Sequence, residues 1–149
     1  MYAVQTSAWM KERLDTTRIA RLECFRFDRE ASGQLPPGYD SGDCRGMLIV
    51  STADGESGVG VFHEMRLKGD FVQWACAFQR IKGLTLCDAL QTTLLKHEAW
   101  GDERTAAVMT AIRALIRPPG DESDARTSLA DCFRDSSYCF RHAEAYIIF

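Results

Sequence analysis

The chain has 149 residues, which is enough for one domain with a substantial core and too few for two comfortable domains. With 46% hydrophobic and 26% charged residues, it has the composition of a globular protein rather than a disordered one. The formal net charge of −3 and the scattered Lys and Arg residues argue against nucleic-acid binding, and the short apolar runs argue against a membrane span.

The cysteines and the first residues of the chain indicate the cellular compartment of the protein. Six cysteines are present, but the first residues lack the basic start and apolar stretch of a secretory signal, so we expect a cytoplasmic protein with reduced thiols. No C-x-x-C pair occurs, which leaves a zinc site or a redox motif with little support. We expect four thiols to pack in the core as small hydrophobic groups: Cys24, Cys76, Cys87 and Cys132.

The first two predicted elements are a short helix and a strand. The stretch "TSAWMKERLD" can form a helix with Thr6 or Ser7 as its N-cap. Over residues 18–27 the apolar residues recur at alternate positions, which predicts a strand. Both faces of this strand are apolar, with Ala20, Leu22 and Cys24 on one and Phe25 and Phe27 on the other.

Residues 28–46 form a long segment rich in Gly, Pro, Asp and Ser. It shows neither strand nor helix periodicity, so we predict a loop. Loops of this length in a compact domain are often functional or mobile. The alternative is an unconstrained crossover between two strands.

A β-hairpin is predicted next, with strands over residues 47–52 and 57–63. Asp54-Gly55 between them suits the positive φ angles of a tight turn. Two glycines on one face of the second strand leave it smooth, so we expect a helix or another backbone to approach closely there. The alternation places Gly58, Gly60 and Phe62 on that face and Val59, Val61 and His63 on the other.

From residue 70 the period changes from two to 3.6, which predicts three helices. Asp70, Thr85 and Asp102 are their expected N-caps, with Asp88 favouring the positive end of the second helix dipole. Gly83 is expected to end the first helix, Gly101 the second and Pro118-Pro119 the third. The expected inward positions are Phe71, Trp74, Ala75, Phe78 and Ile81 in the first, Leu86, Ala89, Leu90 and Leu94 in the second, and Val108, Ala111, Ile112, Leu115 and Ile116 in the third.

The last segment, residues 117–149, is predicted to contain a fourth helix from about Ser128 and a terminal apolar stretch, "AYIIF". That stretch is either an added strand or a hydrophobic plug, because apolar residues must pack on this chain's own sheet or on a neighbour's. Strands over 18–64 therefore precede helices over 70–116 in a single domain, residues 1–149. The predicted fold is α+β, a three-stranded antiparallel meander followed by a bundle of three to four helices.

The strand at residues 18–27, the hairpin and the following helices resemble the N-terminal capping domain of the enolase superfamily, which includes mandelate racemase and muconate-lactonizing enzymes. In that family the second and third strands read like "V-x-T-x-D-G-x-x-G-x-G-E". This sequence matches the pattern at Val50, Thr52, Asp54, Gly55, Gly58 and Gly60. Glu64 departs from it, because it is displaced from the position where the family's Glu follows Gly. The resemblance covers roughly residues 18–116.

The resemblance also implies what this chain lacks. In the family, a separate barrel of about two hundred residues carries the Lys or His base and the carboxylates that hold Mg²⁺. No K-x-K motif occurs here, and too few residues follow position 116 to build a barrel, so we expect neither a metal nor a cofactor. By position, the long loop matches the family loop that covers the barrel mouth. Its contact residues would be Leu35, Pro36, Pro37 and Tyr39.

Catalytic alternatives rest on His63 and Glu64 at the end of the hairpin. Glu64 could act as a general base. A Cys-His hydrolase would need His63, His97 or His142 beside a thiol. A three-His metal site would need all three histidines to be brought together. The spacing of these residues supports neither arrangement. We expect His97 and His142 to be surface or helix-end residues.

Two hypotheses follow. The first is a non-catalytic capping-domain-like protein that binds a small molecule or a protein, as a homodimer, because a capping domain normally buries a face against its barrel. The second is an enzyme, or an enzyme subunit related to the enolase superfamily, that needs a separate barrel chain for catalysis. The sequence leaves open whether the protein is an enzyme.

Overall fold

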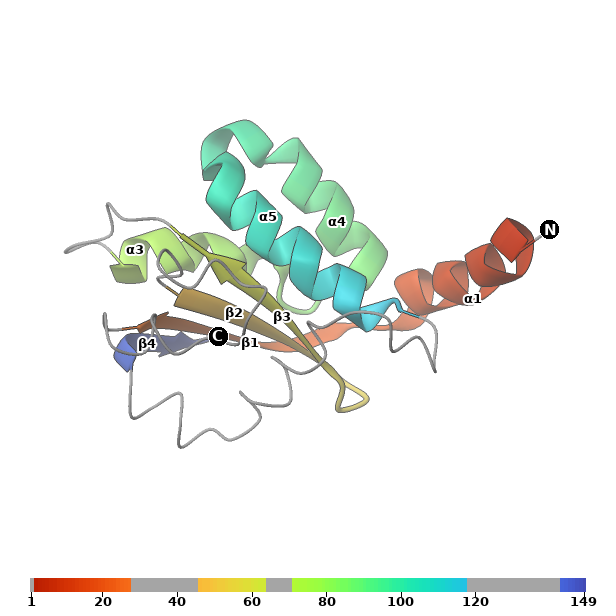
Figure 1. Ribbon diagram of the computed structural model, residues 1–149, viewed down its shortest axis with the longest axis horizontal. Coiled ribbons are helices and arrows are strands. Elements are labelled where there is room, and N and C mark those ends of the chain that lie inside the picture. Colours follow the sequence, from red (N-terminus) through yellow and green to blue (C-terminus); the bar gives the residue numbers. More distant parts are fainter. Residues whose placement is uncertain (1, 28–45, 64–70, 118–142) are drawn as a thin grey trace.

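The computed structural model describes residues 2–27, 46–63, 71–117 and 143–149. It is an α+β fold in which one antiparallel sheet carries helices on one of its faces (Figure 1). The strands are β1 (Ile19–Phe27), β2 (Gly46–Thr52), β3 (Ser57–Phe62) and β4 (Ala143–Ile148). The helices are α1 (Tyr2–Thr16), α3 (Phe71–Ala75), the 3₁₀ helix η1 (Cys76–Ile81), α4 (Leu86–Leu95) and α5 (His97–Leu115).

The spatial strand order is β3-β2-β1-β4, and every neighbouring pair is antiparallel. The predicted meander of β1, β2 and β3 is confirmed. The terminal "AYIIF" is a fourth strand beside β1, where Phe149 and Leu22 exchange two backbone hydrogen bonds of 2.8 and 3.2 Å. The predicted order of strands first and helices second holds from β1 to α5. The expected short helix before the first strand is α1, and β4 follows the helices.

Four residues lie between β2 and β3, and the first three of them form a loop closed by Thr52 and Glu56. The amide of Thr52 donates to the carbonyl of Glu56 at 2.8 Å, and Gly55 has a φ of +90°. Asp54 does not share this positive φ, so only one of the two expected turn residues adopts it. A three-residue hairpin loop needs a left-handed residue only at its last position, which explains the difference.

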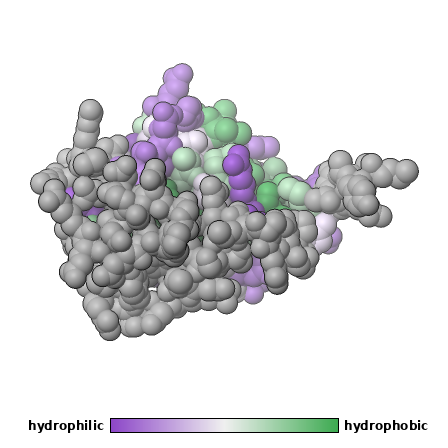
Figure 2. All heavy atoms as spheres, viewed as in Figure 1, coloured by the Kyte–Doolittle hydropathy of each residue, from purple (hydrophilic) through white to green (hydrophobic). Residues whose placement is uncertain are grey.

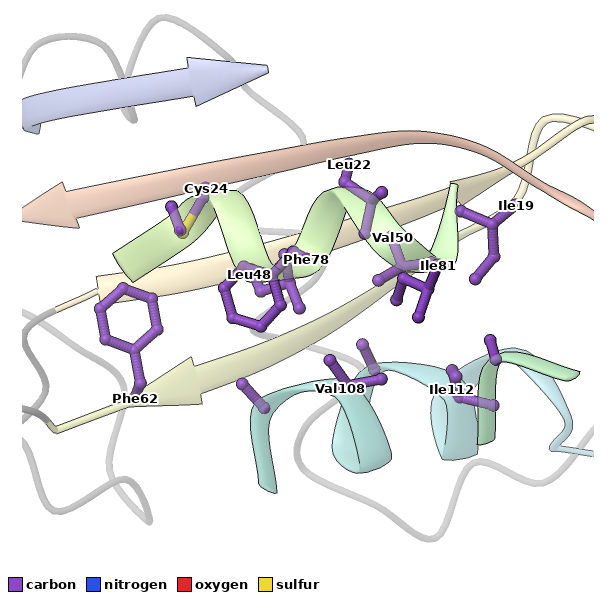
Figure 3. Packing of buried hydrophobic residues seen from close by; sticks show 14 of the residues in the cluster. Ile19, Leu22, Cys24, Leu48, Val50, Phe62, Phe78, Ile81, Val108 and Ile112 are labelled. Atoms are coloured by element: carbon purple, nitrogen blue, oxygen red, sulfur yellow. The ribbon is translucent and has the colours of Figure 1, made fainter. Parts of the chain in front are cut away.

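The main core lies between the sheet and the helices (Figure 3). There Leu22 and Cys24 of β1 point toward the same space as Val108 and Ile112 of α5. The face of β3 that carries Gly58 and Gly60 packs against a helix, as predicted. A Cβ atom added at Gly58 or Gly60 would collide with backbone carbonyls of α5. These glycines therefore let α5 lie directly on the strand.

The first predicted helix of the bundle changes type along its length. It is α-helical over α3 and 3₁₀ over η1, and it ends at Ile81, two residues before Gly83, whose φ is +84°. Ala75, Phe78 and Ile81 are buried at intervals of three, which is the repeat of a 3₁₀ helix, so tightening the helix keeps all three in the core. Its expected N-cap, Asp70, lies outside the described residues.

The boundary between the second and third predicted helices lies at a different residue from the one predicted. The hydroxyl of Thr85 accepts the amide of Asp88 at 3.1 Å, which confirms the N-cap of α4. This helix ends at Leu95 rather than at Gly101, and one further turn begins at His97. Gly101, with φ +83° and ψ 170°, then interrupts the helical backbone of α5.

Four smaller predictions are wrong for local reasons. A register shift between Ile19 and Arg21 leaves Ala20 exposed. Thr93 takes the inward position of α4, its hydroxyl bonded to a carbonyl, and Leu94 is 61% exposed. Cys76 is exposed because the 3₁₀ repeat turns it outward. The expected caps Thr6 and Ser7 lie inside α1, which begins at Tyr2.

Other cysteine predictions have mixed outcomes: Cys24 is buried, Cys87 is half-buried, and Cys132 lies outside the described residues. The fourth helix from Ser128 is also outside them. Among the helices that the structure describes, none combines the length and hydrophobicity needed to cross a bilayer.

Candidate functional site

His63 lies just beyond the end of β3, where α5 crosses the strand. Its backbone amide donates to the Glu103 carboxylate at 2.9 Å, whereas its ring Nδ1 is buried without a hydrogen-bond partner. The carboxylate therefore fixes the strand end rather than orienting the imidazole for proton transfer. The expected neighbour, Glu64, lies outside the described residues, as do the loop residues Leu35, Pro36, Pro37 and Tyr39.

His97 is a helix-end residue, as predicted. Its Nε2 lies 2.8 Å from the Asp102 carboxylate, so the pair bridges the interruption at Gly101 on the surface. His142, the third histidine, lies outside the described residues. In the described part of the chain, no three His, Cys, Asp or Glu side chains are grouped as a metal site would require.

The buried thiol of Cys24 is unsuited to nucleophilic catalysis. Burial raises its pKa far above the usual range, so the thiol stays protonated. Its partners in the main core are apolar, and no hydrogen bond joins a thiol to an imidazole within residues 2–27, 46–63, 71–117 and 143–149. The described residues thus assemble no Cys-His pair.

Arg13 of α1 makes polar contacts with two distant parts of the chain. Its guanidinium donates to the carboxylates of Asp54 and Glu56 at the hairpin turn and to the carbonyl of Leu115 at the end of α5. A hydrogen bond from Thr52, assisted by Arg13, lowers the pKa of Asp54. Because these contacts join three elements of one chain, Arg13 acts as an anchor for α1.

The face of the sheet opposite α3, α4 and α5, here called the second sheet face, carries a second apolar cluster. Phe25, Phe27 and Met47 are buried there, and their described neighbours include Val61 and Tyr146. Strand register aligns four of these side chains in one row across the sheet, Val61–Met47–Phe25–Tyr146. The rings of Phe25 and Tyr146 lie 4.7 Å apart between centroids.

The next row of the second sheet face is more exposed and contains a charge. It runs Val59–Ile49–Glu23–Ile148 across the four strands. Glu23 keeps 15% of its side chain exposed, whereas Ile148 is 49% exposed. A carboxylate among three branched apolar residues is unusual, because burying a charge without partners is costly.

Glu23 is satisfied by two neighbours on the same face. The guanidinium of Arg21 lies 3.3 Å from one carboxylate oxygen, and the phenol of Tyr146 donates to the other at 3.2 Å. Burial and the adjacent carboxylate raise the pKa of Tyr146, so its phenol remains a donor at neutral pH. At the next position toward the hairpin turn, the hydroxyls of Ser51 and Ser57 lie 3.0 Å apart.

This row and its polar neighbours form the candidate site, and they are not among the site residues predicted from the sequence. Alternation along "RLECFRF" could have placed Arg21 and Glu23 on the face of Phe25 and Phe27. No local pattern could have placed Tyr146 beside Glu23, because 123 positions separate them in the chain.

A second exposed apolar feature lies on the helix side. Leu94 and Leu95, at the end of α4, are 61% and 85% exposed. Figure 2 shows hydrophobic residues at the surface over α4 and α5 in this view.

Comparison of the chain with protein-family profiles, curated protein sequences and solved structures gave no match.

Proposed function

We propose that this chain is a non-catalytic binding protein that acts through its second sheet face and resembles an enolase-superfamily capping domain. The observation that carries the proposal is the row Val59–Ile49–Glu23–Ile148, which is half-buried on three strands, exposed at Ile148, and joined to one satisfied ion pair. Protein interfaces combine these features, an apolar centre and a polar rim with paired charges.

A protein partner fits this surface better than a small molecule. Small ligands favour concave sites that enclose most of their surface, whereas the row crosses the whole width of a sheet. The partner is a second copy of the chain or a separate enzyme chain. In the second case the protein is an enzyme subunit that supplies a capping domain to a barrel.

Site-specific photo-crosslinking in the cells that make the protein tests the proposal. A photoreactive residue at Ser57, which is exposed beside the row, should form an adduct with a protein. The same residue at Leu95, exposed on the helix side, is the matched control and should not. Adducts only from position 95, or from neither position, would rule out the second sheet face as the binding surface.

The identity of the adduct separates the two partners. A crosslinked second copy supports self-association. A crosslinked chain that carries a barrel with metal-binding carboxylates supports the enzyme subunit, and activity should then require both chains.

A further inference from the structure

We propose that the exposed end of the second sheet face is a self-complementary contact between two copies of this chain, paired through Arg21 and Glu23. The inference rests on the proposed function and names its partner. It starts from a gradient of exposure along β1, where Phe25 is 1% exposed and the side chains of Glu23 and Arg21 are 15% and 55% exposed. Ile148, which pairs with Glu23 on the neighbouring strand, is 49% exposed. The apolar surface available to a partner is therefore centred on Ile148.

Charge on this patch favours a second copy. Arg21 has a 55% exposed side chain and lies beside the Glu23 carboxylate, so the patch carries one positive and one negative group. A patch of one sign would repel its own copy, whereas opposite charges side by side can pair across a two-fold axis. The net charge of −3 adds little repulsion between two whole chains.

The geometry of a strand supports that pairing. Positions 21 and 23 lie on the same face, roughly 7 Å apart. A two-fold axis that runs along the face, perpendicular to β1 and midway between them, sets Arg21 of each copy over Glu23 of the other. The same rotation places Ile148 of each copy over the row of Arg21 in the other, so the two Ile148 side chains are diagonal neighbours roughly 7 Å apart along the strand direction. Apolar contact and charge pairing are thus satisfied by one symmetry operation.

The size of the patch predicts a weak dimer. A stable interface buries roughly 800 Å² on each partner, and one exposed row with its polar neighbours is smaller than that. We therefore expect dissociation in the micromolar range or weaker, and further weakening by salt. Sedimentation equilibrium over a series of protein and salt concentrations measures both.

Charge reversal gives the decisive experiment. Arg21→Glu and Glu23→Arg should each abolish self-association, because each places like charges opposite each other in the homodimer. An equimolar mixture of the two variants should regain association as a heterodimer, since all facing charges are then opposite. Arg80→Glu, an exposed change in η1 on the helix side, is the control and should leave the dimer unchanged. A mixture that stays monomeric while wild type dimerises would overturn the pairing.

Glu23→Arg also removes an acceptor from Tyr146, so its fold must be checked by circular dichroism. If that variant does not fold, Ile148→Asp provides the second test, with Leu95→Asp as its matched control. Dimers lost only in Ile148→Asp support the inference, and dimers lost only in Leu95→Asp overturn it. Wild type that remains monomeric at several hundred micromolar also overturns it. An adduct between Ser57 and a different protein would then leave the proposed function standing.

Discussion

The two faces of the sheet differ in how fully the described chain closes them. On the helix face, Leu22, Leu48 and Val50 are completely buried beneath α5 and the helices beside it. On the second sheet face, exposure rises along β1 from Phe25 to Glu23 and Arg21, and Ile148 beside Glu23 is half exposed. The same strands supply both faces, so the difference lies in what covers them: helices pack over the first face, and the outer row of the second keeps contact with water.

The largest expected effects test whether the inner part of both faces is packed alike. Phe78→Ala on the helix side and Phe25→Ala on the second sheet face should each lower the free energy of unfolding by about 3 to 5 kcal/mol. Both rings are buried, and each loses its contacts and leaves a cavity. Urea denaturation of the two variants measures this. A much smaller loss in Phe25→Ala would mean that the second face is loosely packed.

The next prediction tests the close contact between β3 and α5, which involves the helix face alone. Gly60→Val should destabilise the protein by about 3 kcal/mol, since the new side chain meets the backbone of α5 at Ala107. Val61→Ala, one position along and on the other face, is the control and should cost less. Thermal unfolding of both variants reports the difference. Equal melting temperatures for Gly60→Val and wild type would contradict the placement of α5.

A smaller effect is expected at the exposed end of the second sheet face. Ile148→Ala should lower the stability of dilute protein by about 1 kcal/mol or less, because half of the side chain already contacts water. Repeating the urea titration at high concentration sharpens the comparison. If Ile148 is a contact between copies, the loss should increase with protein concentration.

The smallest effect is a change in alkaline stability through Tyr146. Its pKa is raised first by burial and then by the Glu23 carboxylate, so the neutral phenol is favoured in the folded state. The contribution of the neutral phenol to folding stability is complete below the usual tyrosine pKa near 10. It is lost as pH rises through the raised pKa of Tyr146 in the folded protein. Tyr146→Phe should therefore unfold less readily above about pH 10 than wild type.

Glu23→Gln is the companion variant, because it removes the neighbouring charge and keeps the side-chain shape. Spectrophotometric titration should show the phenol of Tyr146 ionising at a lower pH than in wild type. An unchanged titration would mean that burial alone raises this pKa.

Several elements could be predicted because their causes are local. Thr85 caps α4 through its own side chain, and the two glycines of β3 mark the face on which α5 lies. The meander was predicted for the same reason, since alternation and an Asp-Gly turn act over a few residues. The inward positions of helices were less certain: Thr93 replaced Leu94 because a hydroxyl can bond its own helix and be buried.

The candidate site could not be predicted because it depends on strands distant in the chain. Alternation can assign Arg21 and Glu23 to a face, but it cannot say that β4 lies beside β1. The expected site residue His63 is described at a strand end, where Glu103 holds its backbone amide. The candidate site lies on the face of Val59 and Val61, away from the end of the hairpin, because pairing with β4 brings Tyr146 to Glu23.

By itself, the sequence determined the α+β class, the antiparallel meander and the close contact surface on β3, because periodicity, turn residues and glycine spacing act locally. Only the tertiary structure decided that the last strand joins the sheet at β1, that the 3₁₀ segment turns Cys76 outward, and that Glu23 is held by a phenol from the other end of the chain. Those outcomes depend on which surfaces meet, and strand pairing between distant segments is fixed by packing of the whole domain rather than by any short pattern.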